Sequence, residues 1–402
     1  MTSLTHASFV PLIGGEAIGS EQAFGKRPEY ILSYSGFEPN DRHLVHHYRN
    51  EVPYYLADEG VPSLPYVDVI SSVCPCAGLS NLNPGSSADN PTNEWLYKTA
   101  KVVFENLKPQ VYWGENAPTF ASEKGAKIRK RMFELGKQHG YSMSVYRTKS
   151  LLHGLPQIRE RSFYFFWKGD KVPTFQTFER ERPSIEDLIR NVKSDFQNDL
   201  INHRKPTEHP YYRYVLEKMH PGMTHPEFQK SLTRSVDVFN YALEAGESFD
   251  EIAAWMTANG YDRDAAKILR RKAKREAGLG FMVRTVVIPN DRIGAFVGYL
   301  PGGLAHPDED RYLNYREAMS IMGLPEDFEL LDPKNNTNHI CQNVPVPVAR
   351  DMAAEIIATL EGKREMHRTD YLLQRNHNGE VKFGFDEPKK IKRVSATLEA
   401  VL

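Results

Sequence analysis

Short apolar runs alternate with amphipathic stretches over the first 170 residues of the chain. Residues 94–107 place apolar side chains at helical spacing, and residues 123–140 form a basic helical pattern that ends at a glycine. The apolar runs have the composition of buried strands and lie at 8–13, 30–34, 67–73, 111–115, 142–147 and 161–169. Strands that alternate with helices predict an α/β fold with a doubly wound, mostly parallel sheet.

The pattern changes after this region. Residues 171–305 are polar, aromatic and largely helical in pattern, so we expect a second domain inserted there after a first domain at 1–170. Short helices return over 306–362 and end in an apolar-faced helix, which we expect to return to the first domain. Residues 363–402 are charged and sparse in apolar runs, and they predict a surface tail.

Charge and cysteine content narrow the class of protein. The 402 residues include 51 Lys and Arg against 52 Asp and Glu, so any site for a polyanion must be a local patch. No apolar stretch approaches the ~18 residues of a membrane span, and the N-terminus lacks the layout of a signal peptide. Three cysteines cannot form a disulfide framework, and reduced thiols are typical of a cytosolic protein.

Two of these cysteines flank one proline in the stretch SSVCPCAGLS, residues 71–80. Cys74 and Cys76 could be packed thiols, a metal or redox pair, or a nucleophile with a neighbour. Neither the histidines at 43–47 nor Cys341 supplies a second ligand pair at metal-binding spacing, so we expect no metal. A cysteine just past a strand end lies where open α/β sheets place their ligands.

Charged side chains follow at the ends of the next two predicted strands. Glu115 ends the strand at 111–115, while Gln157, Arg159 and Arg161 precede the strand at 161–169. The cysteine, the carboxylate and the arginine pair therefore all fall in loops at the same edge of the predicted sheet.

Together these stretches resemble the cytosine-C5 methyltransferase family. PCAGLS (75–80) is similar to its nucleophile loop, ENA (115–117) to its Glu-Asn-Val motif, and QIRER (157–161) to its Gln-x-Arg-x-Arg motif. Residues 311–328 resemble its Arg-x-Leu-Thr-x-Arg-Glu segment, with Asn314 in place of threonine, and residues 342–349 resemble its closing segment. The unmatched middle of the chain corresponds to the target recognition domain that this family inserts there.

The resemblance implies a chemistry in which Cys76 attacks carbon 6 of a cytosine and so activates carbon 5 for methylation. It implies Glu115 as the acid at ring N3, Arg161 as the group that binds O2, and Arg159 as support for the loop and phosphates. The substrate would be double-stranded DNA with the cytosine flipped out, because carbon 5 is not accessible to this chemistry inside a duplex. The small, polar loop 79–95 would close over that base, although its composition also fits an ordinary connection.

The methyl donor implied is S-adenosylmethionine, and here the chain departs from the family. The usual opening Asp-Leu-Phe-x-Gly-x-Gly-Gly becomes SFVPLIGG, with Ser8 at the acidic position and Leu12 at the first glycine. The alternatives Glu38 or Asp41 at the ribose, and Asp58 at the adenine or as a surface acid, stay open. The donor-binding residues that the resemblance implies are Phe9, Gly14, Gly15, Glu38, Asp41, Asp58, Pro75 and Asn343.

A basic stretch lies inside the expected recognition domain. Residues 263–278 carry seven Lys and Arg against two acids, which predicts phosphate contacts there, although a solvated helix face has the same composition. Residues 123–131 are a second candidate patch. The residues expected to bind nucleic acid are Ser80, Gln157, Lys267, Arg270, Arg271 and Lys274.

The function predicted from sequence is a DNA (cytosine-5-)-methyltransferase, monomeric and cytoplasmic or nucleoid-associated, with no membrane partner. Two alternatives stay open. One is a relative that methylates a tRNA cytosine, and the other is a catalytically silent DNA-binding relative.

Overall fold

The structure is a computed structural model that describes residues 4–81, 83, 85–193, 200–279, 285–298 and 300–385. The chain forms two compact units. The first, which we call the sheet unit, comprises Met1–Leu155, Arg159–Glu181 and Met322–Leu402, and the second, the helical unit, comprises Pro156–Ile158 and Arg182–Ile321. Apart from Pro156–Ile158, the helical unit begins at Arg182 and ends at Ile321, whereas the sequence pattern predicted 171–305. Residues 171–173 instead pair with a strand of the sheet unit.

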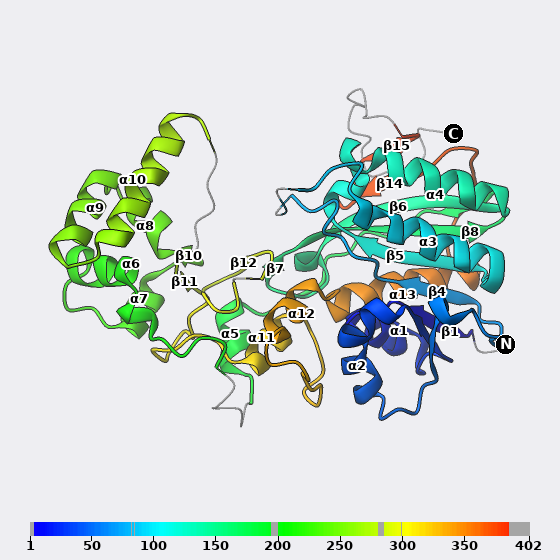
Figure 1. Cartoon of the computed structure of the whole chain (residues 1–402), viewed down its shortest axis with the longest axis horizontal. Coiled ribbons are helices and arrows are strands. Elements are labelled where there is room, and N and C mark those ends of the chain that lie inside the picture. Colours follow the sequence, from blue (N-terminus) through cyan, green and yellow to red (C-terminus); the bar gives the residue numbers. More distant parts are fainter. Residues whose placement is uncertain are drawn as a thin grey trace. The chain divides into compact units, whose positions relative to one another are not determined.

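The sheet unit is built on a nine-stranded sheet with the order β15-β14-β6-β8-β5-β4-β1-β2-β3 (Figure 1). Its strands are β1 (His6–Phe9), β2 (Ile31–Ser33), β3 (Tyr54–Leu56), β4 (Val69–Ser72), β5 (Val111–Asn116), β6 (Tyr141–Lys149), β8 (Glu160–Lys168), β14 (Leu373–Asn376) and β15 (Val381–Phe383). Strands β1 to β5 are parallel, whereas β8 runs antiparallel to both β5 and β6. The predicted mostly parallel α/β sheet is confirmed.

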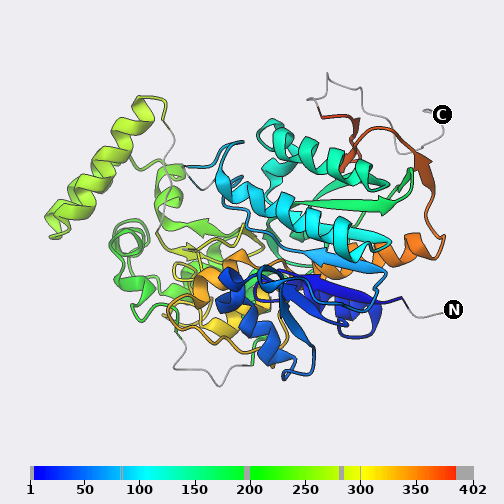
Figure 2. The ribbon, with the colours of Figure 1, turned by 45° about the vertical axis from the view of Figure 1, so that its right-hand side comes forward.

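Helices cover both faces of this sheet (Figures 1 and 2). They are α1 (Gly15–Phe24), α2 (Glu38–His47), α3 (Glu94–Val102), α4 (Ala126–Gln138), α12 (Asn336–Gln342) and α13 (Val346–Leu360). Helices α3 and α4 pack against each other, and α1 packs against α13. A Cβ on Gly19 would lie 2.6 Å from the Cβ of Ala349, so glycine is what lets α1 and α13 approach this closely. The C-terminal helix therefore returns to the first βα element.

The strand β1 is shorter than the apolar run at 8–13 predicts. It ends at Phe9 because Val10 and Leu12 both adopt left-handed backbone conformations, each with φ of 54°. This region is costly for a side chain with a Cβ, above all for a β-branched one, and such strain collects at functional sites. The chain therefore leaves the sheet in a strained loop that leads into α1.

The region 363–402, expected from sequence to be a charged tail, contains strands where it is described. Strand β13 (Met366–Arg368) pairs with β9 (Lys171–Pro173), and β14 pairs with β6 at the margin of the main sheet. Short strands at a sheet margin need few apolar residues, which is why the sequence pattern does not reveal them. The remaining residues, 386–402, lie outside the described residues.

The helical unit has a core of its own, with buried aromatic rings that include Tyr212, Tyr214, Phe228 and Phe239. Its helices are α5 (Ile185–Arg190), α6 (Pro210–Arg213), α7 (His225–Ser231), α8 (Val238–Glu244), α9 (Phe249–Ala258), α10 (Asp262–Glu276) and α11 (Tyr315–Ile321). Its strands are β7 (Gln157–Ile158), β10 (Val236–Asp237), β11 (Val287–Ile288) and β12 (Ile293–Gly294). The insert is largely helical, as predicted. Across the described part of the chain, no helix has the length and apolar character needed to cross a membrane.

Candidate active site

The strand register brings four predicted residues to one edge of the sheet. Cys76 follows the end of β4, Glu115 lies in β5, and Arg159 and Arg161 flank the start of β8. Strand β4 is parallel to β5, with Ser72 opposite Gly114, whereas β5 is antiparallel to β8. The carboxyl ends of β4 and β5 therefore meet the beginning of β8.

Glu115 is a buried acid with a charged partner. Its side chain is 2% exposed, and its Oε1 lies 2.6 Å from Nε of Arg161. Burial raises the pKa of this carboxyl, while the guanidiniums of Arg161 and Arg159 oppose that rise. A carboxyl whose pKa is raised retains its proton to higher pH, which suits it to donate a hydrogen bond or a proton.

The two cysteines of the motif differ in surroundings. Cys74 is 1% exposed, its Sγ lies 3.4 Å from Oγ1 of Thr99, and burial raises its pKa to about 11. Cys76 is half-buried, and burial also raises the pKa of its thiol, but the guanidiniums of Arg161 and Arg159 lower it. Cys74 is thus a packed thiol, whereas Cys76 faces the groups that stabilise a thiolate.

Arg159 connects this cluster to the loop that follows β1. Its side chain is 1% exposed, and its Nη2 donates to the carbonyl of Asn343 at 3.1 Å. The side-chain Oδ1 of Asn343 accepts a hydrogen bond from the backbone N–H of Gly15 at 2.9 Å. Burial lowers the pKa of Arg159 to about 9. Sequence reasoning nominated Asn343 for the donor but missed this link, which joins residues far apart in the chain.

The glycine loop has features that fit a bound S-adenosylmethionine. Gly14 has φ of 105° and precedes α1, whose N-terminus carries no side-chain cap. Beside it, Nδ2 of Asn343 is buried and finds no hydrogen-bond partner among the described residues. An amide N–H and a helix N-terminus are both suitable partners for the carboxylate of the donor's amino-acid part.

A buried carboxylate that sequence reasoning missed lies under this loop. Glu16 is 1% exposed, and its two oxygens accept hydrogen bonds from Ser8 at 2.8 Å and Ser20 at 2.9 Å. Burial raises its pKa, and the surrounding hydroxyls oppose that rise. Ser8 stands where the family opening has an acid. The strand β1 therefore lacks that acid, and the carboxylate bonded to Ser8 comes from Glu16 in the following helix α1. The serine at that position is the sequence signal that could have prompted a search for an acid elsewhere in the chain.

Aromatic rings gather near the ends of β1 and β2. Phe9 packs against Tyr34 with ring centroids 5.2 Å apart, and Trp95 lies 5.0 Å from Tyr34 and 5.1 Å from Phe37. Of these, only Phe9 was predicted as a donor contact. Trp95 was missed because α3, which carries it, lies far along the chain from the glycine loop.

The predicted donor acids lie in different surroundings. Glu38 is exposed at the start of α2, whereas Asp41 is fully buried and accepts from Ser33 and, at 3.0 Å, from Tyr54. Burial raises the pKa of Asp41 to about 7. Asp58 is exposed and accepts a hydrogen bond from the backbone of Ser35 at 3.0 Å. Asp58 thus lies at the end of β2, where it is exposed, whereas Asp41 is shielded from solvent.

The loop after Cys76 is tied to the start of α4. Pro75 and Ser80 lie half-buried at its root, and Lys124 donates to Asn81 at 3.1 Å and to Ser86 at 3.0 Å. Lys127 pairs with Asp89 in the same loop. The basic segment 123–131, considered above as a phosphate patch, is thus engaged with this loop.

Gln157, which the sequence predicts to contact nucleic acid, is not exposed in the structure. It is fully buried in the helical unit, its Nε2 donates to the carbonyl of Ile321 at 2.8 Å, and its Oε1 accepts from the backbone of Phe296 at 3.5 Å. Both ends of the amide thus contact backbone groups of the helical unit, and a nucleic-acid contact by Gln157 stays a prediction.

The four predicted cations of α10 separate into two pairs. Arg270 and Lys274 are exposed and form no ion pair with any residue in the described ranges. Lys267 instead pairs with Asp264 at 2.7 Å, and the guanidinium of Arg271 lies 5.0 Å from the ring centre of Phe239. Of these four cations, Arg270 and Lys274 are the two that are both exposed and without a carboxylate partner among the described residues, so they are the better candidates to bind an anion.

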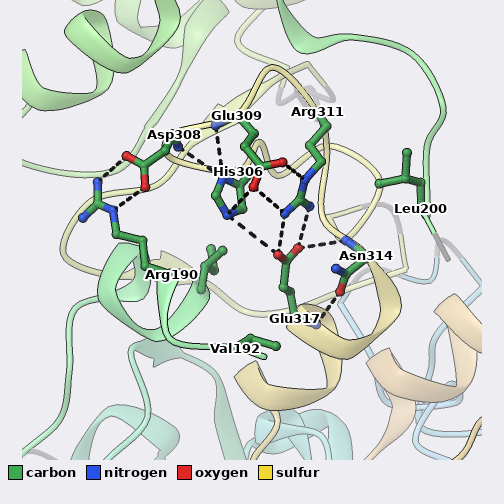
Figure 3. A pocket seen from close by; sticks show the side chains of 10 residues that line it. Arg190, Val192, Leu200, His306, Asp308, Glu309, Arg311, Asn314 and Glu317 are labelled. Carbon is green, nitrogen blue, oxygen red and sulfur yellow. Dashed lines mark hydrogen bonds and ion pairs between the residues drawn. The ribbon is translucent and has the colours of Figure 1, made fainter. Parts of the chain in front are cut away.

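A cavity of about 660 Å³ in the helical unit is lined by an ion-pair network (Figure 3). Arg311 donates to both oxygens of Glu317 at 2.8 and 2.9 Å, and His306 Nδ1 accepts from two backbone N–H groups. Because these groups satisfy one another, the cavity offers no reacting group, and the cysteine cluster remains the candidate active site.

Comparison with known proteins identifies a matching family and related sequences. The family described as C-5 cytosine-specific DNA methylase matches residues 47–358. The chain is 21% identical over 313 residues to the type II methylase M.HgiDII of Herpetosiphon aurantiacus, covering 74% of this chain and 79% of that protein.

Two solved structures share the fold. A prophage-encoded E. coli protein, named as a DNA modification methyltransferase, superimposes with a TM-score of 0.54 at 17% identity, covering 89% of this chain and all of that one. A Spodoptera frugiperda DNMT2 mutant gives a TM-score of 0.51 at 13% identity, covering 88% of this chain and 100% of that one. The sheet unit therefore has the fold of these methyltransferases.

Proposed function

The chain belongs to the C-5 cytosine-specific DNA methylase family, and from this premise we propose that it methylates carbon 5 of a cytosine in double-stranded DNA through a covalent adduct on Cys76. The observation that carries the proposal is the cluster at one sheet edge, where Arg161 pairs with Glu115 and the charges of Arg161 and Arg159 favour the thiolate of Cys76. A nucleophile, an acid and two anion-binding forks are the groups that this chemistry requires.

The proposed reaction begins with the thiolate of Cys76, which attacks carbon 6 of the cytosine. The C5–C6 double bond breaks, and its electron pair moves to carbon 5 while Glu115 donates its proton or a hydrogen bond at N3. Burial raises the pKa of Glu115, which favours this role as a hydrogen-bond or proton donor, while Arg161 and Arg159 oppose the rise. Once the electron pair on carbon 5 has formed a bond to the methyl group, the carbon-5 proton passes to solvent, its C–H electron pair re-forms the C5–C6 double bond, and the thiolate of Cys76 departs.

S-adenosylmethionine, when bound, supplies a methyl group on a sulfonium that an electron-rich carbon accepts. We propose that Asn343, Gly14, Gly15 and the N-terminus of α1 hold its amino-acid part, with Phe9, Pro75 and Asp58 near the nucleoside. Support comes from the buried Nδ2 of Asn343 and the uncapped start of α1. Glu38 remains the exposed candidate for the ribose.

DNA contacts are proposed for two regions. The loop that carries Ser80 would close over a flipped-out cytosine, which costs a few kcal/mol of unstacking. In the helical unit, the proposed target recognition domain, Arg270 and Lys274 on α10 would contact phosphates. Their exposure and lack of a carboxylate partner within the described residues support this assignment.

Trapping the adduct tests the proposal. Random-sequence duplexes that contain 5-fluorocytosine, incubated with protein and S-adenosylmethionine, are expected to give a covalent complex stable on a denaturing gel, because fluorine blocks loss of the group at carbon 5. Wild type and Cys74→Ser should form the complex, and Cys76→Ser should not.

An adduct that persists in Cys76→Ser would contradict the assignment of the nucleophile. A parallel reaction with a fluorocytosine-containing RNA checks the substrate. A complex formed with RNA and not with duplex DNA would contradict DNA as the target.

A further inference from the structure

The turn that follows Glu115 touches both neighbouring segments of the site. Asn116 donates through Nδ2 to the carbonyl of Cys74 at 3.5 Å, and the hydroxyl of Thr119 donates to the carbonyl of Leu79. From the other side, the hydroxyl of Ser162, next to Arg161, donates to the carbonyl of Pro118 at 3.1 Å. The turn 116–122 therefore links the cysteine segment to β8.

One buried arginine holds this turn. Arg129 on α4 is 0% exposed, and its Nη1 donates to the carbonyls of Phe120 and, at 2.7 Å, of Ser122. A Cβ on Gly125 would lie 2.2 Å from the same Phe120 carbonyl, so a glycine at the entry to α4 lets the helix approach the turn. Two carbonyls of the turn, those of Phe120 and Ser122, are thus bound to a helix that packs on α3 and β6.

Packing alone does not account for this side chain. Within the described residues, Nε and Nη2 of Arg129 find no hydrogen-bond partner, and no carboxylate forms an ion pair with it. Burial lowers its pKa to about 10. A buried charge without a counter-charge is costly, and methionine would fill a similar volume without that cost. What arginine adds is a terminal nitrogen, Nη1, that donates to two carbonyls of the turn at once.

We propose that Arg129 is a positioning residue for the active site: by fixing the turn 116–122 it fixes Glu115 and Arg161 relative to Cys76. The proposal rests on the proposed role of Cys76 as the nucleophile. Because Arg161 is the largest charged influence that favours the Cys76 thiolate, a turn that relaxes should leave the thiol harder to ionise.

The test measures thiol reactivity, which does not depend on methyl transfer. Alkylation of the full-length protein by iodoacetamide is followed from pH 6 to 10 by mass spectrometry of the peptide that contains Cys76. The variants are Arg129→Met and Arg129→Lys, and Lys137→Met is the matched control. Lys137 lies on the same helix α4, outside the basic segment 123–131, and is exposed with no ion pair to any described residue.

Arg129→Met is expected to move the alkylation midpoint upward and to slow alkylation at pH 8 about threefold, with Arg129→Lys between it and wild type. In methyl transfer, kcat of the same variants should fall by about 10- to 100-fold, while KM for DNA changes less. The reason is that displacement of Glu115 and Arg161 relative to Cys76 affects the chemical step. Lys137→Met should match wild type in both measurements.

An alkylation profile of Arg129→Met that superimposes on wild type would overturn the proposal, even if the variant melts at a lower temperature. Should Arg129→Met fail to fold, Thr119→Val decides instead, since it removes only the hydroxyl bridge between the turn and Leu79. A shifted Cys76 profile in Thr119→Val supports the proposal, and an unshifted one overturns it. If the Arg129 variants shift the alkylation profile but the wild-type protein does not methylate cytosine, only the proposed function is contradicted.

Discussion

At the scale of single residues, Asn314 shows how the chain departs from its family without losing an interaction. Its Oδ1 accepts from the backbone N–H of Glu317 at 2.8 Å, and the carboxylate of Glu317 accepts from the N–H of Asn314 at 2.9 Å. This reciprocal pair is a capping box at the start of α11. Asparagine and threonine both serve at this position, so the replacement keeps the cap.

We therefore expect Asn314→Thr to leave the free energy of unfolding within about 0.5 kcal/mol of wild type, and Asn314→Ala to lower it by about 1 kcal/mol. Urea unfolding followed by circular dichroism measures both. Equal losses in the two variants would show that the asparagine does more than cap the helix.

At the scale of elements, a histidine pair joins α2 to α12. The Nε2 of His43 lies 3.0 Å from Nδ1 of His339, and His43 Nδ1 accepts from the backbone of Leu331 at 3.0 Å. Burial lowers the pKa of His43 to about 4 and also lowers the pKa of His339, with Arg42 opposing protonation of both and Asp332 favouring it. Helix α12 leads directly to Asn343, so this junction supports the closing segment of the site.

Acid should weaken the junction. The unfolded chain takes up protons on these histidines near pH 6.5, whereas the folded chain does not, so their contribution to stability is complete above that pH and is lost as the pH falls toward 4. We expect the fall in Tm between pH 7 and 5 to be smaller in His339→Gln than in wild type by about 2–4 °C.

The control for that experiment is His46→Gln on the same helix α2, because His46 is exposed and its Nε2 lies 3.0 Å from Oε2 of Glu329, away from the pair. A pH dependence of Tm in His339→Gln identical to that of wild type would exclude the pair as its origin.

Helix α10 makes a second prediction at this scale. Neutralising its two exposed cations in Arg270→Gln/Lys274→Gln should flatten the dependence of log Kd for DNA on log salt concentration by about 1.8, or 0.9 for each lost phosphate contact. The matched control is Lys267→Gln/Arg271→Gln, whose cations are paired or packed on rings. A larger effect in the control would reverse the assignment made from exposure.

At the scale of the whole molecule, every candidate donor contact belongs to the sheet unit, while the helical unit has a separate core. Binding of a donor analogue should therefore slow amide hydrogen exchange in the sheet unit and leave exchange in the helical unit unchanged. This separation makes donor binding measurable without DNA.

Hydrogen exchange checks that separation. S-adenosylhomocysteine is expected to slow amide exchange at residues 13–16 and around 343, and to leave residues 249–276 unchanged. Asn343→Ala should lose the protection, since both its bond to Gly15 and its buried amide are removed. Protection of α9 and α10 by the analogue alone would contradict a donor site confined to the sheet unit.

How much the sequence predicts depends on how local the signal is. The sheet and the four residues of the cluster were predictable, because apolar runs mark strands and motifs mark their ends. The bonds of Asn343 to Gly15 and Arg159 were not, since they join residues 328 and 184 positions apart. The burial of Gln157 and Arg129 also has no local signal, because polar side chains enter a core only where distant backbone groups meet them.

The bond between Arg159 and Asn343 also sets an order of assembly during synthesis. Those residues are 184 positions apart, which a ribosome translating 5–20 residues per second covers in roughly 10–40 s. During that interval the nascent chain already contains Cys76, Glu115 and both arginines, but lacks the carbonyl that holds Arg159 and the amide that holds Gly15. Cys76 is thus synthesised long before the bonds of Asn343 to Arg159 and Gly15 can form. Only a chain translated past residue 343 can form them.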